Sequence, residues 1–184
     1  MNPATCNVRL RAWRDDDLPA FTAMNADPEV MRCFPQPLTA EESQEMFERL
    51  RRGLAERGWG LWAVEADGRF AGFTGLAEPK FSAPFTPCVE IGWRLRRDCW
   101  GRGIGFAAAR IAERRAFDKL HLPELVSFTA ASNERSRRLM ERLGFTRDPR
   151  DDFLHPNLPE NHPLRPHVLY RKRKPATAGQ ARPD

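Results

Sequence analysis

The sequence lacks the features that mark membrane, secreted and zinc-binding proteins. No run approaches the ~18 consecutive apolar residues that a membrane span needs. Residues 1–10 lack the basic and apolar regions of a signal peptide. The four cysteines form no CxxC pair, so neither a zinc site nor a disulfide framework is indicated. These absences predict a cytoplasmic, globular protein with reduced thiols and no metal.

The length of 184 residues predicts a single domain, because domains usually run roughly 100–200 residues. We expect this domain to cover 1–174. The last residues, 175–184, read PATAGQARPD, a composition that predicts a disordered tail. No internal repeat is visible.

The net charge of +5 is unevenly distributed. Residues 1–93 carry 10 basic and 14 acidic side chains, whereas 94–147 carry 13 basic and 6 acidic ones. The remaining 148–184 carry 7 basic and 5 acidic residues. A positive field in the middle of the chain predicts a polyanionic partner there, either a nucleic acid or a nucleotide-bearing cofactor.

Apolar periodicity and turn residues predict a mixed α/β sheet without regular βαβ repeats. Gly92, inside one expected strand, indicates a bulge or a close backbone approach. Loops are expected at 79–87 and 148–166. Helices are expected at 18–25, 39–58, 106–120 and 133–143, and strands at 8–13, 61–65, 69–76, 89–95, 125–129, 145–147 and 167–170.

Three glycines, Gly101, Gly103 and Gly105, separate an expected strand from an expected helix. Glycines let another group approach the backbone, and the first helical turn offers free N–H groups, so the pattern favours a pyrophosphate site. The basic residues Arg96, Arg97 and Arg102 surround it, although a solvated basic surface is the alternative. No Lys-Ser/Thr pair follows Gly105, which disfavours a P-loop, and the GxGxG spacing differs from the dinucleotide-binding GxGxxG.

The stretch 89–105, VEIGWRLRRDCWGRGIG, resembles the acyl-coenzyme A motif of the GNAT superfamily of N-acetyltransferases. The stretch 133–145, NERSRRLMERLGF, resembles the N-x-x-S/A…GF helix of the same superfamily. The W-G-x-G form is similar to the branch that includes the ribosomal-protein-alanine N-acetyltransferases. The resemblance runs from about 8 to 171.

The resemblance implies a mostly antiparallel sheet with helices on both faces and a bulged central strand that splays from its neighbour. Acetyl-CoA would enter the resulting gap as cosubstrate. The superfamily usually has Gln or Arg where this sequence has Trp100, but a backbone anion site does not depend on that side chain. The implied cofactor-binding residues are Trp93, Arg94, Leu95, Arg97, Trp100, Gly101, Arg102, Gly103, Ile104, Gly105 and Asn133.

The resemblance also implies direct transfer of the acetyl group to an acceptor amine, without an acyl-enzyme. Many members use a Tyr seven residues after the Asn as general acid, but Met140 stands there. Ser136 is the expected substitute acid. Glu90 is the leading candidate base and Glu78 the second, although each also fits a plain surface or ion-pairing role.

Other residues and functions remain open at this stage. The histidines at 155, 162 and 167 fit either the acceptor site or loop capping. Cys99 lacks a histidine partner, which disfavours a nucleophilic role. A silent acyl-CoA-binding regulator is one alternative to the enzyme, and a basic nucleic-acid-binding module is a weaker one, because no such motif is present. The acceptor, a small-molecule amine or a peptide N-terminus, and the choice between monomer and homodimer are not specified.

Overall fold

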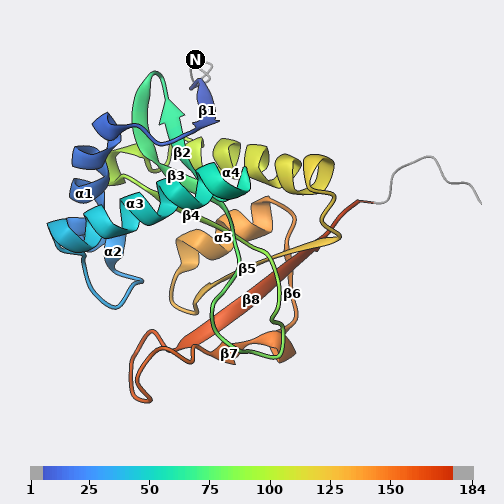
Figure 1. Ribbon diagram of the computed structural model, residues 1–184. Coiled ribbons are helices and arrows are strands. Elements are labelled where there is room, and N and C mark those ends of the chain that lie inside the picture. The colour runs from blue at the N-terminus through green and yellow to red at the C-terminus, as the bar shows by residue number, and fades with distance from the viewer. Residues whose placement is uncertain (1–5, 176–184) are drawn as a thin grey trace, which may run out of the picture.

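The computed structural model describes residues 6–175, and the expected helices and strands form within it (Figure 1). Among these residues, no helix combines the length and the apolar character needed to cross a membrane. The α-helices are α1 (Leu18–Ala26), α2 (Pro28–Met31), α3 (Ala40–Arg57), α4 (Ile104–Arg114) and α5 (Glu134–Arg142). The strands are β1 (Val8–Arg11), β2 (Leu61–Ala66), β3 (Arg69–Ala77), β4 (Glu90–Leu95), β5 (Glu124–Ala130), β6 (Thr146–Arg147), β7 (Phe153–Leu154) and β8 (Pro166–Arg173).

Local sequence signals explain where α3 begins and ends. The Thr39 hydroxyl accepts a hydrogen bond from the Glu42 N–H at 3.1 Å, and the Glu42 carboxylate accepts one from the Thr39 N–H at 2.8 Å. This reciprocal capping satisfies two of the free donors of the first turn. Gly58 ends the helix with φ of 71°, a left-handed conformation that favours glycine.

Three local features differ from the sequence-based expectation. Pro28 begins the short helix α2, because proline is tolerated in a first helical turn and the Asp27 side chain caps the Glu29 N–H at 2.8 Å. Helix α4 begins at Ile104 and continues as a π-helical turn over Arg115–Lys119. The two-residue strand β7 lies inside the expected loop 148–166. The expected disordered tail falls, beyond residue 175, outside the described residues.

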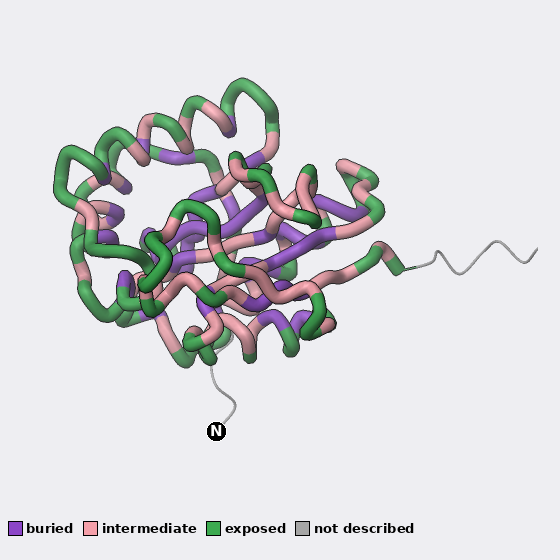
Figure 2. Tube along the Cα trace, turned by 90° about the horizontal axis from the view of Figure 1, so that it is seen from below, coloured by how far each residue is buried: buried purple, intermediate pink, exposed green. Residues whose placement is uncertain are grey.

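The strands form one eight-stranded sheet in the order β1-β2-β3-β4-β5-β8-β6, with β7 paired to β8. All pairings are antiparallel except that of β4 with β5. The expectation of a mostly antiparallel mixed sheet is therefore confirmed. The buried residues are concentrated between the sheet and the helices (Figure 2).

The side chains of β4 show which helices cover each face of the sheet. Successive residues of a strand point to opposite faces. Arg94 bonds to Asn25 of α1, whereas the Leu95 side chain lies against Gly105 of α4. Helices α1 and α3 therefore cover the face that carries Arg94, and α4 covers the other.

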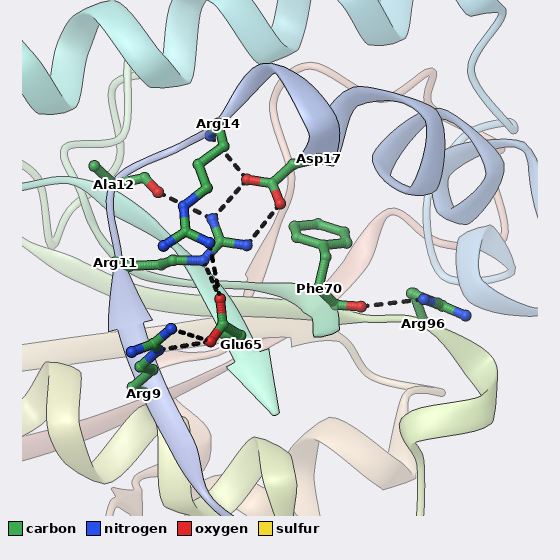
Figure 3. A network of polar contacts seen from close by, with 8 residues as sticks. All are labelled: Arg9, Arg11, Ala12, Arg14, Asp17, Glu65, Phe70 and Arg96. Atoms are coloured by element: carbon green, nitrogen blue, oxygen red, sulfur yellow. Dashed lines mark hydrogen bonds and ion pairs between the residues drawn. The ribbon is translucent and has the colours of Figure 1, made fainter. Parts of the chain in front are cut away.

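Of the two alternatives predicted at Gly92, a bulge or a close backbone approach, no bulge is found in the register of β4 with β3. Six consecutive pairs run without a shift from Gly72↔Leu95 to Ala77↔Glu90. The irregularity lies instead between Val64 and Glu65 of β2. The buried Glu65 carboxylate there accepts hydrogen bonds from basic side chains of the β1 segment, Arg9, Arg11 and Arg14 (Figure 3). On β3 the shift leaves Ala71 without a partner beside Gly72, whose φ of 142° lies in the region that favours glycine.

Strands β4 and β5 separate after a single pair, Glu90↔Val126. The Val126 N–H donates to the Val89 carbonyl at 3.0 Å, and the next contact is made by a side chain, from the Ser127 hydroxyl to the Ile91 carbonyl at 2.8 Å. No further pair is formed between the two described strands, although β4 continues to Leu95 and β5 to Ala130. The sheet is therefore open on the far side of Ile91.

Candidate active site

The open edge of β4 presents the backbone of Trp93 and Leu95 to the gap. In an antiparallel pair, alternate residues direct their N–H and C=O groups to the same neighbour. The Arg96 N–H donates to the Ala71 carbonyl on β3, and Val89 faces β5, so the odd-numbered residues of β4 face β5. Because β5 has diverged, the peptide groups around Trp93 are free to pair with a ligand.

The glycine loop lies beyond the end of β4, at the start of α4. Gly101 has φ of 73° and Gly103 has φ of 76°, and an added Cβ at either position would meet no atom within 4 Å. Backbone conformation, and not lack of space, therefore requires glycine at both positions. Gly103 caps α4, so the first-turn N–H groups and the positive end of the helix dipole face outward as an anion site.

A cleft of about 690 Å³ joins the gap, the glycine loop and the α1 face of the sheet. It brings together most of the residues that the sequence indicated. The expected site residues that line it are Glu90, Trp93, Arg94, Leu95, Trp100, Gly101, Gly103, Ile104, Gly105, Asn133 and Ser136.

Arg97 and Arg102 do not line the cleft, contrary to the expectation that they contact phosphates. The Arg102 guanidinium lies 3.6 Å from the Asp67 carboxylate at the β2–β3 turn. Arg96 donates to the Phe70 carbonyl at 3.1 Å (Figure 3), and it also pairs with Asp98. Arg96 and Arg102 are therefore held outside the cleft wall by acidic and carbonyl partners.

Basic side chains of α5, and not Arg97 or Arg102, line the cleft wall near the glycine loop. Arg135, Arg138 and Arg142 all line it. The Arg135 guanidinium stacks over the Trp100 ring at 3.8 Å, and Arg142 stacks over Phe106 at 4.1 Å. Their i, i+3, i+7 spacing places them on one helix face, a signal that was present in the sequence.

Asn133 and Ser136 occupy the first turn of α5. The Asn133 carbonyl oxygen accepts a hydrogen bond from the Ser136 N–H at 3.3 Å, and its amide donates to the Thr129 hydroxyl at 2.9 Å. Asn133 is thus the N-cap that fixes α5 against β5. Within residues 6–175, no hydrogen bond of the Ser136 hydroxyl is found, and the residue lines the cleft.

Glu90 is the carboxylate at the point where the gap opens. It is half-buried, and within residues 6–175 it makes neither an ion pair nor a hydrogen bond through its side chain. Burial without compensating partners raises the pKa of the Glu90 carboxyl to about 8. The other candidate base, Glu78, is exposed and is not part of the cleft wall. The geometry therefore favours Glu90 over Glu78.

Two of the histidines also reach the cleft. His155 and His167 line it with ring centroids 4.8 Å apart, whereas His162 does not. Burial lowers the pKa of both imidazoles, which keeps them neutral at pH 7. His167 Nδ1 lies 3.1 Å from the Arg165 carbonyl, which can only accept, so the neutral ring carries its proton there and leaves Nε2 free.

Neither Met140, which stands at the position of the usual tyrosine general acid, nor Tyr170 is part of the cleft wall. Met140, at the usual tyrosine position, is only 1% exposed and belongs to the core. Tyr170 is the only tyrosine of the chain, and its buried hydroxyl donates to Glu141 at 2.8 Å.

Arg94 lies in the cleft but not where the cofactor expectation placed it. Its backbone pairs with Phe73 of β3, and its side chain points to the α1 face, away from α4. The pleat of β4 separates it from the glycine loop, so it belongs to the other half of the cleft.

The sheet opens beside the glycine-capped start of α4, as the resemblance to the GNAT superfamily implied. The chain belongs to the GNAT acetyltransferase family, since the model described as "Acetyltransferase (GNAT) domain" matches residues 7–146. The superfamily resemblance is therefore confirmed.

Similar proteins agree with this assignment. FsC-acetyl coenzyme A-N(2)-transacetylase of Aspergillus fumigatus is 33% identical over 130 residues, which cover 67% of this chain and 55% of the relative. An acetyltransferase structure from Agrobacterium tumefaciens has a TM-score of 0.70 at 27% identity, covering 90% of each chain. Mycobacterium smegmatis RimJ in complex with CoA-disulfide shares the fold, with a TM-score of 0.71 at 19% identity over 94% of this chain and 88% of that one.

Proposed function

We propose that this protein transfers the acetyl group of acetyl-CoA directly to a primary amine, a small molecule or a peptide N-terminus. The observation that carries the proposal is the separation of β4 from β5 after Glu90↔Val126 beside the glycine-capped start of α4. We further propose that 1–174 act as one domain in the cytoplasm, in keeping with four free cysteines.

The residues of the cleft fit the three chemical parts of acetyl-CoA. The free peptide groups of Trp93 and the Leu95 N–H suit the amides of the pantetheine arm, whereas the Leu95 carbonyl already accepts a hydrogen bond from the Trp100 indole at 3.0 Å. The loop Trp100–Gly105 and the first turn of α4 suit the pyrophosphate. The α5 arginines, with Arg135 on Trp100, suit the remaining phosphate and the base. RimJ of Mycobacterium smegmatis, which has the same fold, binds CoA-disulfide.

The proposed chemistry needs one stabilised oxyanion and two proton transfers. A backbone N–H of β4 facing the gap polarises the thioester carbonyl while the amine attacks it. Glu90 takes the proton of the amine, directly or through a water, and its raised pKa of about 8 suits a base that works at mildly alkaline pH. His167, with Nε2 free on the same cleft wall, is the second base that the geometry permits.

Ser136 is the proposed acid that returns a proton to the leaving thiolate. It lines the cleft at the start of α5, and its hydroxyl is not engaged by the described residues. The positive end of the α5 dipole also stabilises a thiolate there, which lowers the demand on the acid. A Ser136→Ala variant is therefore expected to lose only about tenfold in kcat, at the low end for general catalysis.

The test combines donor binding and acceptor turnover. Calorimetric titration is expected to show one acetyl-CoA site with a micromolar dissociation constant. An amine screen that follows free CoA thiol is then expected to show amine-dependent turnover. A folded protein that binds no acetyl-CoA at tens of micromolar would overturn the proposal. Binding without thiol release across all amines would instead support a silent regulator.

A further inference from the structure

Arg94 is a buried cation that lacks a counter-ion. Arg94 is only 9% exposed, and within residues 6–175 it makes no ion pair. Its Nε atom is buried without any hydrogen-bond partner. Burial lowers the pKa of its guanidinium to about 10, with no opposing contribution from a carboxylate, so the group remains charged at neutral pH. A buried charge normally requires an opposite charge or a full set of hydrogen bonds.

Neutral groups hold this guanidinium in a fixed position. Its Nη1 donates to the Asn25 side-chain carbonyl at 2.7 Å, and the Asn25 amide donates to the Ser43 hydroxyl at 3.4 Å. Asn25 and Ser43 are fully buried. Phe34 and Phe73 stack against the guanidinium, with centroids at 4.1 and 5.4 Å. The guanidinium is therefore already held in place, and no carboxylate of the described residues neutralises its charge.

Glu90 and Arg94 lie on the same face of β4, with Gly92 between them. Side chains two and four residues apart share one face of a strand. A Cβ added at Gly92 would meet only the Glu90 carboxylate, at 3.6 Å, so the space above Gly92 is open. All three residues line the cleft. Along the floor of this half of the cleft, the Glu90 carboxylate comes first, then the open space above Gly92, and then the Arg94 guanidinium.

The phosphates of the donor do not supply the missing charge. The glycine loop belongs to the α4 face, where Leu95 contacts Gly105, whereas Arg94 points to the α1 face. Glu29, an exposed residue of the cleft wall, makes no ion pair with Arg94. The counter-ion must therefore come with the second substrate.

We propose that the acceptor is a primary amine that also carries a carboxylate, with its amine beside Glu90 and its carboxylate on Arg94. The inference rests on the proposed function and narrows its acceptor class to amines whose carboxylate lies several bonds away, as in a free ω-amino acid or a peptide that begins with an acidic residue. Four strand residues separate the two Cα atoms by roughly 13 Å. The two long side chains shorten this span, so the amine and carboxylate of the acceptor are several bonds apart.

The first experiment compares acceptors that differ only in the carboxylate. The probes are 4-aminobutyrate and 6-aminohexanoate, each against its carboxamide and against the diamine of equal length. A dipeptide with an N-terminal glutamate, against its glutamine analogue, separates the peptide source from the free amino acid. We expect kcat/KM to be at least about 100-fold higher for the carboxylates, the discrimination that a paired buried charge provides. Equal or better turnover of the diamines would overturn the inference.

Two variants test whether Arg94 is the cause. Arg94→Gln is expected to remove the preference for carboxylates, mainly through KM, while acetyl-CoA affinity stays unchanged. Asn25→Asp places a carboxylate on the guanidinium with little change in volume, and should neutralise the site without deleting the side chain. It is therefore expected to lower turnover of carboxylates and raise that of diamines. Arg52→Gln, on the exposed side of α3, is the matched control.

The readouts separate this inference from the proposed function. If acetyl-CoA does not bind the wild-type protein, the proposed function fails. If acetyl-CoA binds and amines are acetylated, but the carboxylate preference is absent or unaffected in both variants, only the assignment of Arg94 fails. Circular dichroism and thermal melting show whether each variant is folded, and Asn25→Asp decides the question if Arg94→Gln does not fold.

Discussion

Glu90 pairs with Val126 at the one point where β4 and β5 are in register within the described chain. The carboxylate proposed as base therefore stands where the sheet begins to open. The same pair decides which peptide groups of β4 have no partner on β5, because Trp93 lies on the side of this pair where the two strands have separated. Catalytic carboxylate and donor-binding backbone are thus positioned by a single feature of the sheet.

Replacing Glu90 by Gln is expected to lower kcat/KM about 100-fold at pH 9, the usual scale of general-base catalysis. Burial raises the pKa of Glu90 to about 8, so the wild-type carboxyl is mostly protonated, and a poor base, below that pH. The ratio of wild-type to variant activity should therefore rise with pH through about 8 and then level off. This ratio is insensitive to the ionisation of the acceptor itself.

Glu78→Gln is the matched control, because Glu78 is an exposed carboxylate outside the cleft wall. It should retain wild-type activity at every pH. A flat wild-type to Glu90→Gln ratio would transfer the role of base to His167, and a His167→Gln variant would then show the loss.

The same carboxyl is expected to make stability depend on pH. The pKa of Glu90 is higher in the folded state than its ordinary value, so between about pH 4.5 and 8 the folded protein holds a proton that the unfolded chain has released. The contribution of Glu90 to the free energy of unfolding therefore falls as pH rises through this window. Urea unfolding at pH 5 and 8.5 should show that Glu90→Gln gains stability relative to wild type at the higher pH. An equal difference at both pH values would contradict the raised pKa.

The glycines of the loop and of β3 are expected to respond differently to alanine. Gly103→Ala meets no atom, so it should cost only the roughly 1–2 kcal/mol of a left-handed backbone, and should weaken acetyl-CoA binding. Gly72→Ala would place its Cβ 2.2 Å from the Arg94 carbonyl oxygen of the paired strand. That clash should cost at least ~3 kcal/mol or prevent folding. Urea unfolding and calorimetry measure both effects, and equal costs at the two sites would be inconsistent with this packing.

Arg135→Ala is expected to weaken acetyl-CoA binding about tenfold, which corresponds to ~1.4 kcal/mol. The guanidinium stacks on Trp100 at 3.8 Å and faces the cleft beside the glycine loop. Because the lost interaction is electrostatic, the difference between wild type and variant should shrink at high salt. Arg114→Ala, an exposed residue outside the cleft wall on α4, should bind acetyl-CoA like the wild type. Unchanged affinity in Arg135→Ala would exclude α5 from the phosphate site.

The glycine loop, Glu90 and the caps of α3 and α5 could be predicted from the sequence, because each depends on residues close together in the chain. The arginines that line the cleft beside the glycine loop could not be assigned in the same way. Arg102 lies within the loop, but its guanidinium pairs with Asp67, which stands thirty-five positions earlier in the sequence. Arg135 lies far from the loop in sequence, yet it stacks on Trp100.

The sequence by itself determined the mixed, mostly antiparallel sheet, the resemblance to the GNAT superfamily and the glycines between β4 and α4. These depend on backbone conformation, hydrophobic periodicity and residue identity at fixed spacing. Only the tertiary structure decided which charges meet a partner. It paired Arg96 and Arg102 with nearby acids, buried Tyr170 on Glu141, and left Glu90 and Arg94, on one face of β4, without an ion pair among residues 6–175. The energy of a charge depends on burial and on partners distant in sequence, which no local pattern records.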